Sequence, residues 1–445
     1  MILFSPIGAT DPLRDYHDGA MLHIVRHYKE YGLWKVILFY TKEMGDIALT
    51  YDPYKRSIQA VAPYMEIEEI FTDITEPQLF DAFINIFPKT IYDLHEKYPD
   101  KKIILNISSG TPQMQSTLAI LAVECDYTLA VQVNTPIRKA NRGVQFMNNE
   151  EDFVKMLNKM ADDDPKAENR CVEPKLRVVR KHRDKERILS LITRYDYDAA
   201  FMIAKDNNDI PDDVRSLLEH AAYRMKLQPK HASKIINEYN DKKLCPFNGS
   251  KRTLMEYFLT IDTDQKTGNL FGVLIKSTPF LYELLFNFVK RDEELKLESF
   301  CTENSLKDFT LRRNLLEANN PRLLTFLDIK FGGFRNTKLS ATNLTYICEY
   351  AATNSSNTDL RNLYEQICNI VNYLTNRDVF LLRNDAAHII TDIDEEKFVE
   401  MTGFGSKKLV EYFFELLVLV YRESITPQKD FYDNLNKLIQ SAMEK

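Results

Sequence analysis

Short apolar runs recur along the first third of the chain, and longer stretches with helical spacing separate them. The runs cover residues 2–4, 36–40, 67–71, 103–107 and 129–133. Nearly every position in them is apolar, which predicts β-strands that are covered on both faces. The stretches 19–31, 78–97 and 113–124 are long enough to form crossover helices. Strand and helix therefore alternate, which predicts a doubly wound, Rossmann-like, mostly parallel sheet over residues 1–165.

The strand pattern stops further along the chain, where apolar residues recur at spacings of three and four. This spacing predicts amphipathic helices at 187–204, 212–225, 232–239, 253–260, 278–290, 305–318, 360–374 and 409–421. Ser406 is the expected N-cap of the last one. We predict an all-α domain over residues 187–445, joined to the sheet domain by a charged linker at 166–186.

Polar residues follow two of the predicted strands, at 5–12 and at 106–114. Ligands of open α/β sheets bind where strands lead into helices, and a helix N-terminus favours phosphate. An ordinary turn followed by a capped helix is the alternative. The chain has no Gly-x-Gly-x-x-Gly and no Walker sequence, which disfavours a dinucleotide or a hydrolysable triphosphate. A third segment, 134–139, contains Arg138 and can bring cations to a phosphate, although a surface loop explains it more simply.

The run Arg383-Asn384-Asp385-Ala386-Ala387-His388 carries groups suited to cutting RNA without a metal. Histidine can exchange a proton with a ribose 2′-hydroxyl near neutral pH, and arginine can hold a phosphate oxyanion. Small residues between them leave room for a substrate. We expect Arg383 and His388 to project from the N-terminal end of a helix. A helix-end salt bridge from Arg383 to Asp385 or Asp392 is the structural alternative.

The same Arg-to-His spacing occurs twice more, so the spacing alone is a weak signal. Arg177 and His182 lie in a run dense in basic residues, which favours a solvated segment. Arg215 and His220 lie on an amphipathic helix, where we expect a surface arginine and a packed histidine. Arg335 follows a Gly-Gly pair, for which turn chemistry is a sufficient explanation.

Charge and cysteine content narrow the possible functions. The chain of 445 residues has 58 Lys plus Arg against 65 Asp plus Glu, so a broad nucleic-acid-coating surface is disfavoured and any RNA contact should be focal. The six cysteines form no C-x-x-C pair, so neither a zinc site nor a disulfide framework is predicted. No signal sequence or long apolar run is apparent. We expect a cytoplasmic protein that does not enter a membrane.

The pairing of Ser109-Gly110-Thr111-Pro112-Gln113 in an α/β domain with Arg-Asn-x-x-Ala-His in a helical domain resembles the CRISPR-associated ribonucleases of type III-A systems. The runs 1–8 and 18–23 are also similar to the start of that family. The resemblance implies an N-terminal CARF domain that binds a cyclic oligoadenylate. It also implies a C-terminal HEPN domain that uses an Arg-x4-6-His motif to cut single-stranded RNA, not DNA.

The resemblance also implies roles for particular residues. Arg383, Asn384 and His388 would be the catalytic set, and the activator site would be lined by Thr10, Asp11, Ser109, Gly110, Thr111 and Gln113. Family members act as homodimers, which agrees with the need for both an acid and a base when one motif offers one histidine. RNA cleavage would need no metal cofactor, and a hexameric activator ring is favoured over a tetrameric one. Some members also cleave their activator, in which case Asp11 and Thr111 would position the attacking hydroxyl.

Two other functions stay open at this point. Asp385, His388, Asp392 and Asp394 are close enough in sequence to hold magnesium or manganese in a metal-dependent nuclease. Alternatively, the chain is a nucleotide-sensing module without enzymatic activity, whose helical half binds a partner protein.

Overall fold

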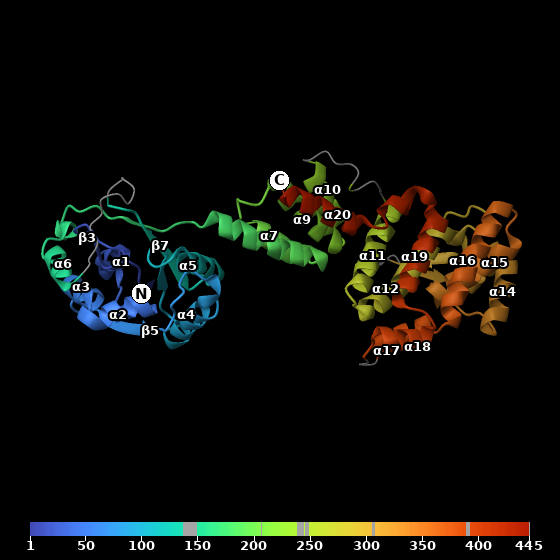
Figure 1. Ribbon diagram of the computed structural model, residues 1–445. Helices are drawn as coiled ribbons and strands as arrows, with labels where there is room; N and C mark the ends of the chain where they lie inside the picture. The colour runs from blue at the N-terminus through green and yellow to red at the C-terminus, as the bar shows by residue number, and fades with distance from the viewer. Residues whose placement is uncertain are drawn as a thin grey trace. The chain divides into compact units, whose positions relative to one another are not determined.

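The structure is a computed structural model that describes residues 1–136, 149–205, 207–237, 244, 249–304, 308–388 and 392–444 (Figure 1). The chain divides into two compact units, Met1–Arg183 and Asp184–Lys445. Each unit has its own apolar core, so the two are described separately.

A six-stranded sheet in the order β5-β4-β1-β6-β7-β8 forms the centre of the first unit. Its strands are β1 (Ile2–Pro6), β4 (Lys35–Tyr40), β5 (Glu66–Phe71), β6 (Ile103–Asn106), β7 (Thr128–Val133) and β8 (Cys171–Val172). The first five pair in parallel, and β8 runs antiparallel to β7. All five predicted strands are therefore confirmed. Edge strand β5 differs from the expectation of full coverage, because none of its residues is buried.

Helices cover both faces of this sheet, as the alternation of strand and helix predicted. Side chains alternate across β1, so Leu3 joins the core under α1 (Ala20–Tyr28), α3 (Pro53–Val61) and α6 (Glu150–Leu157). Phe4 points to the other face, under α4 (Ile86–Lys97) and α5 (Pro112–Glu124). The elements that were not predicted include the short helices α2 (Lys42–Tyr51), α3 and α6, and the hairpin of β2 (Leu13–Arg14) and β3 (His17–Asp18).

The connection predicted at residues 166–186 contains regular structure. Strand β8 extends the sheet, and α7 (Arg177–Thr193) begins soon after it. The first turns of α7 are polar and largely exposed, whereas Ile188 and Ile192 near its end are buried in the core of the second unit. The start of α7 was therefore not predicted, because its charged residues show no apolar spacing and the helix becomes amphipathic only in its second half.

The second unit is largely helical, as predicted. Its helices after α7 are α8 (Tyr197–Lys205), α9 (Asp212–Met225), α10 (Pro229–Asn237), α11 (Gly249–Lys266), α12 (Leu270–Val289), α13 (Arg313–Asn319), α14 (Pro321–Phe331), α15 (Ala341–Asn354), α16 (Thr358–Asn376), α17 (Val379–His388), α18 (Glu395–Thr402), α19 (Ser406–Tyr421) and α20 (Phe431–Met443). One large apolar cluster runs through them. The broadly apolar helix α19 contributes many buried side chains to this core.

Two details of the helical prediction are wrong. A small sheet of β9 (Cys301–Glu303), β10 (Phe309–Leu311) and β11 (Thr337–Lys338) occupies part of the region assigned to helix, because such short strands leave no detectable period. Ser406 is the first residue of α19, and Gly405 is its N-cap. The Glu395 carboxylate accepts hydrogen bonds from the Ser406 N–H at 2.7 Å and its hydroxyl at 2.6 Å, so a distant side chain caps this helix.

The cysteines in the described parts of the chain are free thiols, and Cys245 lies outside them. Burial raises the pKa of the Cys301 and Cys368 thiols to about 12. Across the same residues, no helix combines the length and apolar character that crossing a bilayer requires.

Candidate functional site

The run from Arg383 to His388 occupies the second half of α17. The expectation that it opens a helix is wrong, because α17 begins at Val379, after Asp378 with its positive φ of 55°. Val379, Leu382 and Ala386 are buried at spacings of three and four, which fixes the face that α17 turns toward the core. The C-terminal half of this helix carries the predicted catalytic residues, and His388 is its last residue.

Arg383 and Asn384 contact each other, and His388 lies nearby on the exposed surface. The Arg383 guanidinium is half-buried and donates from Nη1 to Asn384 Oδ1 at 3.2 Å, while its buried Nε has no partner. Asn384 and His388 are four positions apart, so they share one exposed face of the helix. Among the described residues, Arg383 bonds to Asn384 and forms no ion pair with Asp385, which disfavours the helix-end salt bridge to Asp385.

The other two Arg-to-His pairs have the structural roles that their surroundings predicted. Arg177 and His182 are exposed on α7. His220 on α9 is fully buried, with Nδ1 3.0 Å from the Ala232 carbonyl oxygen. Burial lowers the pKa of His220 to about 3, so this histidine stays neutral near pH 7. Arg215 donates to the Asn207 carbonyl oxygen at 3.0 Å.

A polar cleft of about 240 Å³ lies in the first unit where β1, β6 and β7 end. This is the edge at which ligands of open α/β sheets bind. Most of the side chains that line it are polar, and two of them are arginines. The lining residues are Thr10, Arg14, Asp18, Gly19, Ala20, Ile107, Ser108, Gln115, Gln132, Val133, Asn134, Thr135, Pro136 and Arg170. Of the six residues predicted to line the activator site, Thr10 lines this cleft. Asn134 and Thr135 belong to the segment 134–139, which was considered as a source of cations. Arg138 lies outside the described residues.

Asp11 and Ser109, also predicted to line the activator site, are buried beneath this edge. The Asp11 carboxylate accepts hydrogen bonds from the backbone N–H of Gly8 at 3.1 Å and of Met21 at 3.0 Å. Burial raises the pKa of Asp11, although those bonds and one from Ser109 oppose the shift. Ser109 Oγ accepts from Asn106 Nδ2 at 2.7 Å. These contacts give both residues a role in shaping the loops, and direct contact with an activator stays a prediction.

Gly110, Thr111 and Gln113 form the start of α5. Gly110 has a φ of +78°, and a Cβ atom at Gly8 would lie 2.6 Å from its backbone nitrogen, so the two loops touch through their main chains. Thr111 caps α5, accepting from the Met114 N–H at 3.4 Å and donating to the Pro77 carbonyl oxygen at 2.7 Å. Gln113 is half-exposed beside them. Their contact with an activator also stays a prediction.

Sequence reasoning missed several residues of the cleft. Gln132 lies at the end of β7, where the rule about strand ends would have found it. Gln115 anchors the loop before α5, donating to the carbonyl oxygens of Ser108 and Gly110. Arg170 is only 8% exposed and donates to the carbonyl oxygens of Asp18 and Asn134, each at 3.0 Å. No local sequence pattern indicates Arg170, because it lies in the predicted linker.

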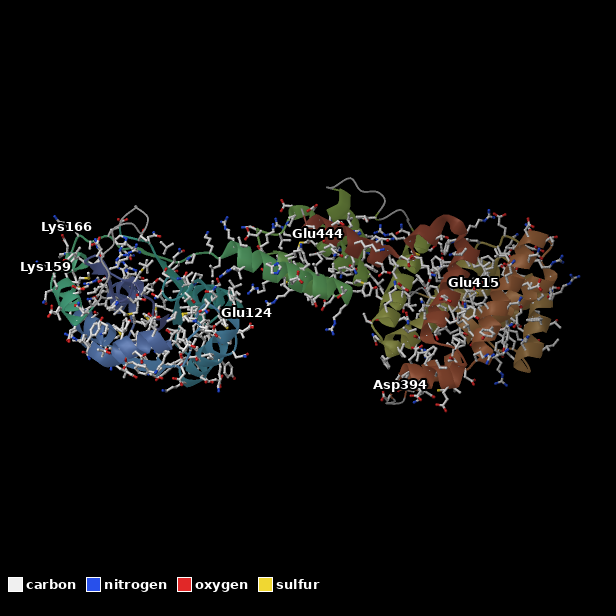
Figure 2. All side chains as sticks on the ribbon, in the orientation of Figure 1. Glu124, Lys159, Lys166, Asp394, Glu415 and Glu444 are labelled. Atoms are coloured by element: carbon white, nitrogen blue, oxygen red, sulfur yellow. The ribbon has the colours of Figure 1, made fainter. Side chains whose placement is uncertain are left out.

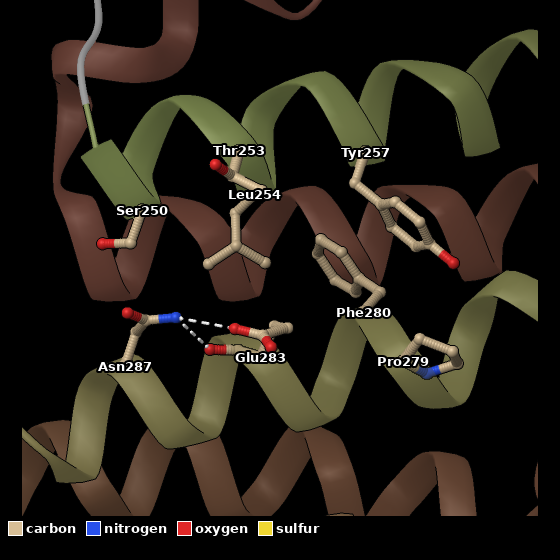
Figure 3. A pocket seen from close by; sticks show the side chains of 8 residues that line it. All are labelled: Ser250, Thr253, Leu254, Tyr257, Pro279, Phe280, Glu283 and Asn287. Carbon is tan, nitrogen blue, oxygen red and sulfur yellow. Dashed lines mark hydrogen bonds between the residues drawn. The ribbon is translucent and has the colours of Figure 1, made fainter. Parts of the chain in front are cut away.

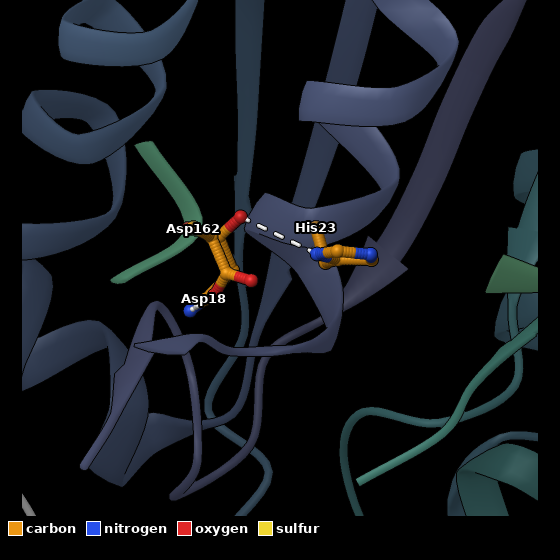
Figure 4. Close-up of side chains that lie close together, drawn as sticks. All are labelled: Asp18, His23 and Asp162. Atoms are coloured by element: carbon orange, nitrogen blue, oxygen red, sulfur yellow. Dashed lines mark hydrogen bonds and ion pairs between the residues drawn. The ribbon is translucent and has the colours of Figure 1, made fainter. Parts of the chain in front are cut away.

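Asp18, His23 and Asp162 lie together beside this cleft (Figure 4). Their ligand atoms are close enough for a metal ion, but arginines already neutralise the carboxylates. Arg26 Nε lies 2.6 Å from Asp18, and Arg170 Nη2 lies 3.3 Å from Asp162. Burial opposes ionisation of Asp18, yet hydrogen bonds from His23 and Arg26 outweigh it and lower its pKa. We interpret the cluster as an ion-pair network that fixes Arg170.

The acidic residues near His388 form no comparable cluster within the described residues. Asp394, labelled in Figure 2, caps α18 and accepts from the Lys397 N–H at 2.8 Å. The geometry therefore gives no support to a metal site built from Asp385, His388, Asp392 and Asp394.

Two cavities in the second unit differ in chemistry. One of about 280 Å³ is lined in part by Arg383 and Asn384. Another, of about 210 Å³, lies between α11 and α12 (Figure 3). Its lining has no cationic side chain, and Asn287 there donates to Glu283. The first cavity is the one suited to a phosphate-bearing ligand.

Three family profiles match the chain in order. They are the Csm6 CARF domain at residues 66–171, the Csm6 6H domain at 174–225 and the Csm6 HEPN domain at 244–440. The HEPN match contains α17, and the CARF match contains the strands β6 and β7 that border the cleft. The profiles thus agree with the division of the chain into a sheet domain and a helical domain.

Curated relatives extend this agreement. A CRISPR system endoribonuclease Csm6 from Mycobacterium tuberculosis is 35% identical over 54% of this chain and 57% of its own length. One from Streptococcus thermophilus is 31% identical over 66% of this chain and 67% of that protein. A solved structure of Enterococcus italicus Csm6, bound to cyclic hexa-2′-fluoro-hexa-dAMP, matches 99% of both chains with a TM-score of 0.64 at 22% identity, which supports the fold. The chain belongs to the Csm6 family of CRISPR system endoribonucleases.

Proposed function

We propose that this protein cuts single-stranded RNA when a cyclic oligoadenylate binds the cleft of its CARF domain. The observation that carries the proposal is the arrangement on α17, where an exposed His388 lies beside the bonded pair of Arg383 and Asn384. In the proposed reaction His388 transfers a proton, Arg383 binds the scissile phosphate and Asn384 orients the arginine. The printed names of the relatives, which are endoribonucleases, support this proposal.

The chemistry calls for two copies of the motif. Attack by a ribose 2′-hydroxyl needs a base to remove its proton and an acid to protonate the leaving 5′-oxygen. One α17 supplies one exposed histidine, His388. A homodimer with two facing α17 helices would supply both groups, as a two-fold axis pairs identical surfaces. The substrate contributes its own nucleophile, so the products are a 2′,3′-cyclic phosphate and a 5′-hydroxyl, no metal is required, and DNA is not cut.

The cleft in the first unit suits the proposed activator. Arg14 provides positive charge for phosphates, and Thr10 and Ser108 provide hydroxyl groups. Ser108 Oγ accepts from the Val133 N–H at 2.8 Å, so its own O–H can be donated to a ligand. The cyclic hexanucleotide in the Enterococcus italicus structure favours a hexameric ring. Activation then requires that the ligand bind the cutting conformation more tightly than the resting one.

An RNA cleavage assay with and without cyclic hexa-adenylate tests this proposal. We expect turnover in EDTA, stronger with the hexamer than with cyclic tetra-adenylate, and a loss of roughly 100-fold or more in His388→Ala. His182→Ala is the matched control, because His182 is an exposed histidine in the same Arg-to-His spacing, and it should keep full activity.

Two contrary results would indicate another function, and a third would exclude His388 as a catalytic residue. Turnover that stops in EDTA and returns with Mg²⁺ would indicate the metal-dependent nuclease. Activator binding without turnover in the parent protein would indicate a sensing module without enzymatic activity. Full activity in His388→Ala would remove this histidine from the mechanism.

A further inference from the structure

The cavity beside Arg383 is enclosed by α12, α15, α16 and α17. It measures about 280 Å³, near the lower end of the range of roughly 300–1,000 Å³ for small-molecule pockets. Its lining is Thr278, Leu281, Leu285, Ala341, Thr342, Thr345, Tyr346, Val371, Asn372, Thr375, Phe380, Arg383 and Asn384. The cavity is therefore continuous with two of the three proposed catalytic residues and has room for one flat ring system, not for a longer ligand.

Three of the polar side chains in this cavity present acceptor oxygens. Thr345 Oγ1 donates to the Ala341 carbonyl oxygen and Thr375 Oγ1 to that of Val371, each at 2.9 Å. Each hydroxyl has thus used its proton and keeps only lone pairs for a ligand. Asn372 Nδ2 donates to Glu349 Oε1 at 3.0 Å, which leaves the Asn372 carbonyl oxygen as a third acceptor.

The walls and one donor complete the cavity. The half-buried rings of Tyr346 and Phe380 give an aromatic lining with Leu281 and Leu285, which suits a planar ring. Asn384 Oδ1 accepts from Arg383 Nη1 at 3.2 Å, which leaves the N–H groups of the Asn384 amide to donate to a ligand.

We propose that this cavity binds one nucleobase next to the scissile phosphate and selects bases with an exocyclic amino group. This inference rests on the proposed RNA cleavage and adds its base preference. Adenine and cytosine each carry an amino group to donate toward the oxygens of Thr345, Thr375 and Asn372, and a ring nitrogen to accept from the Asn384 amide. Uracil replaces the amino group with a carbonyl oxygen, which would face those acceptors without a proton between them.

The experiment maps cut sites in a mixed-sequence RNA with activator present. We expect uridine to be depleted about tenfold or more at one position flanking the cut. Thr345→Val and Asn372→Leu should each reduce that preference severalfold, because each removes one acceptor while Arg383 and His388 stay in place. Thr353→Val is the matched control: Thr353 is on the same helix and donates to the Tyr350 carbonyl oxygen at 3.0 Å, but it does not line the cavity.

A second RNA substrate tests the contribution of the exocyclic amino group of the base on its own. RNA with purine riboside in place of adenosine at the selected position should be cut as poorly as uridine RNA by the parent. Thr345→Val should reduce the difference in rate between the adenosine RNA and the purine riboside RNA severalfold. Thermal melting of each variant, compared with the parent, separates unfolding from loss of base preference.

The outcomes distinguish this inference from the proposed function. If the parent cuts RNA but shows no base preference, or if Thr345→Val and Asn372→Leu keep the parent's preference, the inference is wrong and the proposed function stands. If these variants change the oligomeric state and leave the cut-site profile unchanged, the cavity holds a side chain of a second copy. If the parent does not cut RNA at all, the proposed function itself fails.

Discussion

Replacement of Gly8 by alanine should damage the proposed activator cleft directly. A Cβ atom at this position would lie 2.6 Å from the backbone nitrogen of Gly110 and 3.1 Å from its Cα. Both atoms are main chain, so no side chain can rotate away. The loops after β1 and β6 must separate by about 0.8 Å to restore an ordinary contact of 3.4 Å.

The size of the effect follows from this geometry. Forcing an extra carbon into a packed position typically costs about 1–3 kcal/mol of unfolding free energy. For a unit of this size each kcal/mol lowers the melting temperature by roughly 2–4 °C, so Gly8→Ala should lower that of the first unit by about 2–12 °C. The displaced loops carry Thr10 and Ser108 of the cleft, and a shift of this size is enough to break hydrogen bonds to a ligand.

Calorimetric titration with cyclic hexa-adenylate and differential scanning calorimetry measure the two effects. Gly45→Ala is the control, because Gly45 lies inside helix α2, away from the cleft, and its new Cβ would meet the movable ring of Phe71 at 3.1 Å. We expect Gly45→Ala to bind like the parent, and Gly8→Ala to bind at least tenfold more weakly. Parent-like affinity and melting in Gly8→Ala would refute the conclusion that contact between these main chains shapes the cleft.

Three further predictions concern the helical unit. His388→Ala should change its unfolding free energy by less than about 0.5 kcal/mol, because the side chain is exposed, and chemical denaturation checks this. Glu256→Gln should cost roughly 3–5 kcal/mol in the same assay, since it removes the carboxylate charge bonded at 2.8 Å to the Arg224 guanidinium, which is 2% exposed. The depressed pKa of His220, about 3 in the folded state against 6.5 in the unfolded state, means that stability is lost as pH falls below 6.5. Between pH 7 and pH 5 the parent should therefore lose about 2 kcal/mol more than His220→Gln, and an equal loss in both proteins would contradict the neutral, buried histidine.

The sequence was informative where local patterns and buried surfaces coincide. Four of the five predicted strands, β1, β4, β6 and β7, lie inside the sheet, where both faces are covered and nearly every residue is apolar. The fifth, edge strand β5, has no buried residue and mixes glutamates with apolar residues. The strand-end rule led to the loop that contains Thr10, which lines the cleft. The residues around Arg383 distinguished its pair with His388, whose imidazole is exposed, from the pair of Arg215 and His220, whose imidazole is buried.

The remaining features depend on contacts between distant segments. Arg170 donates to a carbonyl oxygen 152 positions away at Asp18, and nothing near Arg170 in the sequence indicates that contact. The cap of α19 comes from Glu395, so the local rule wrongly chose Ser406. The strands β9 to β11 are two or three residues long and are defined by their partners, not by any periodicity. The cavity beside Arg383 needs four helices to form, and no single helix carries a signal for it.

The separate interiors of the two units have an evolutionary consequence. No apolar cluster among the described residues draws side chains from both the sheet and the helical bundle. Substitutions that adapt the cleft to a different ligand can therefore accumulate without repacking the interior around α17. Under the proposed function, such modularity lets selection change which activator the CARF domain binds while the residues proposed to cut RNA stay the same.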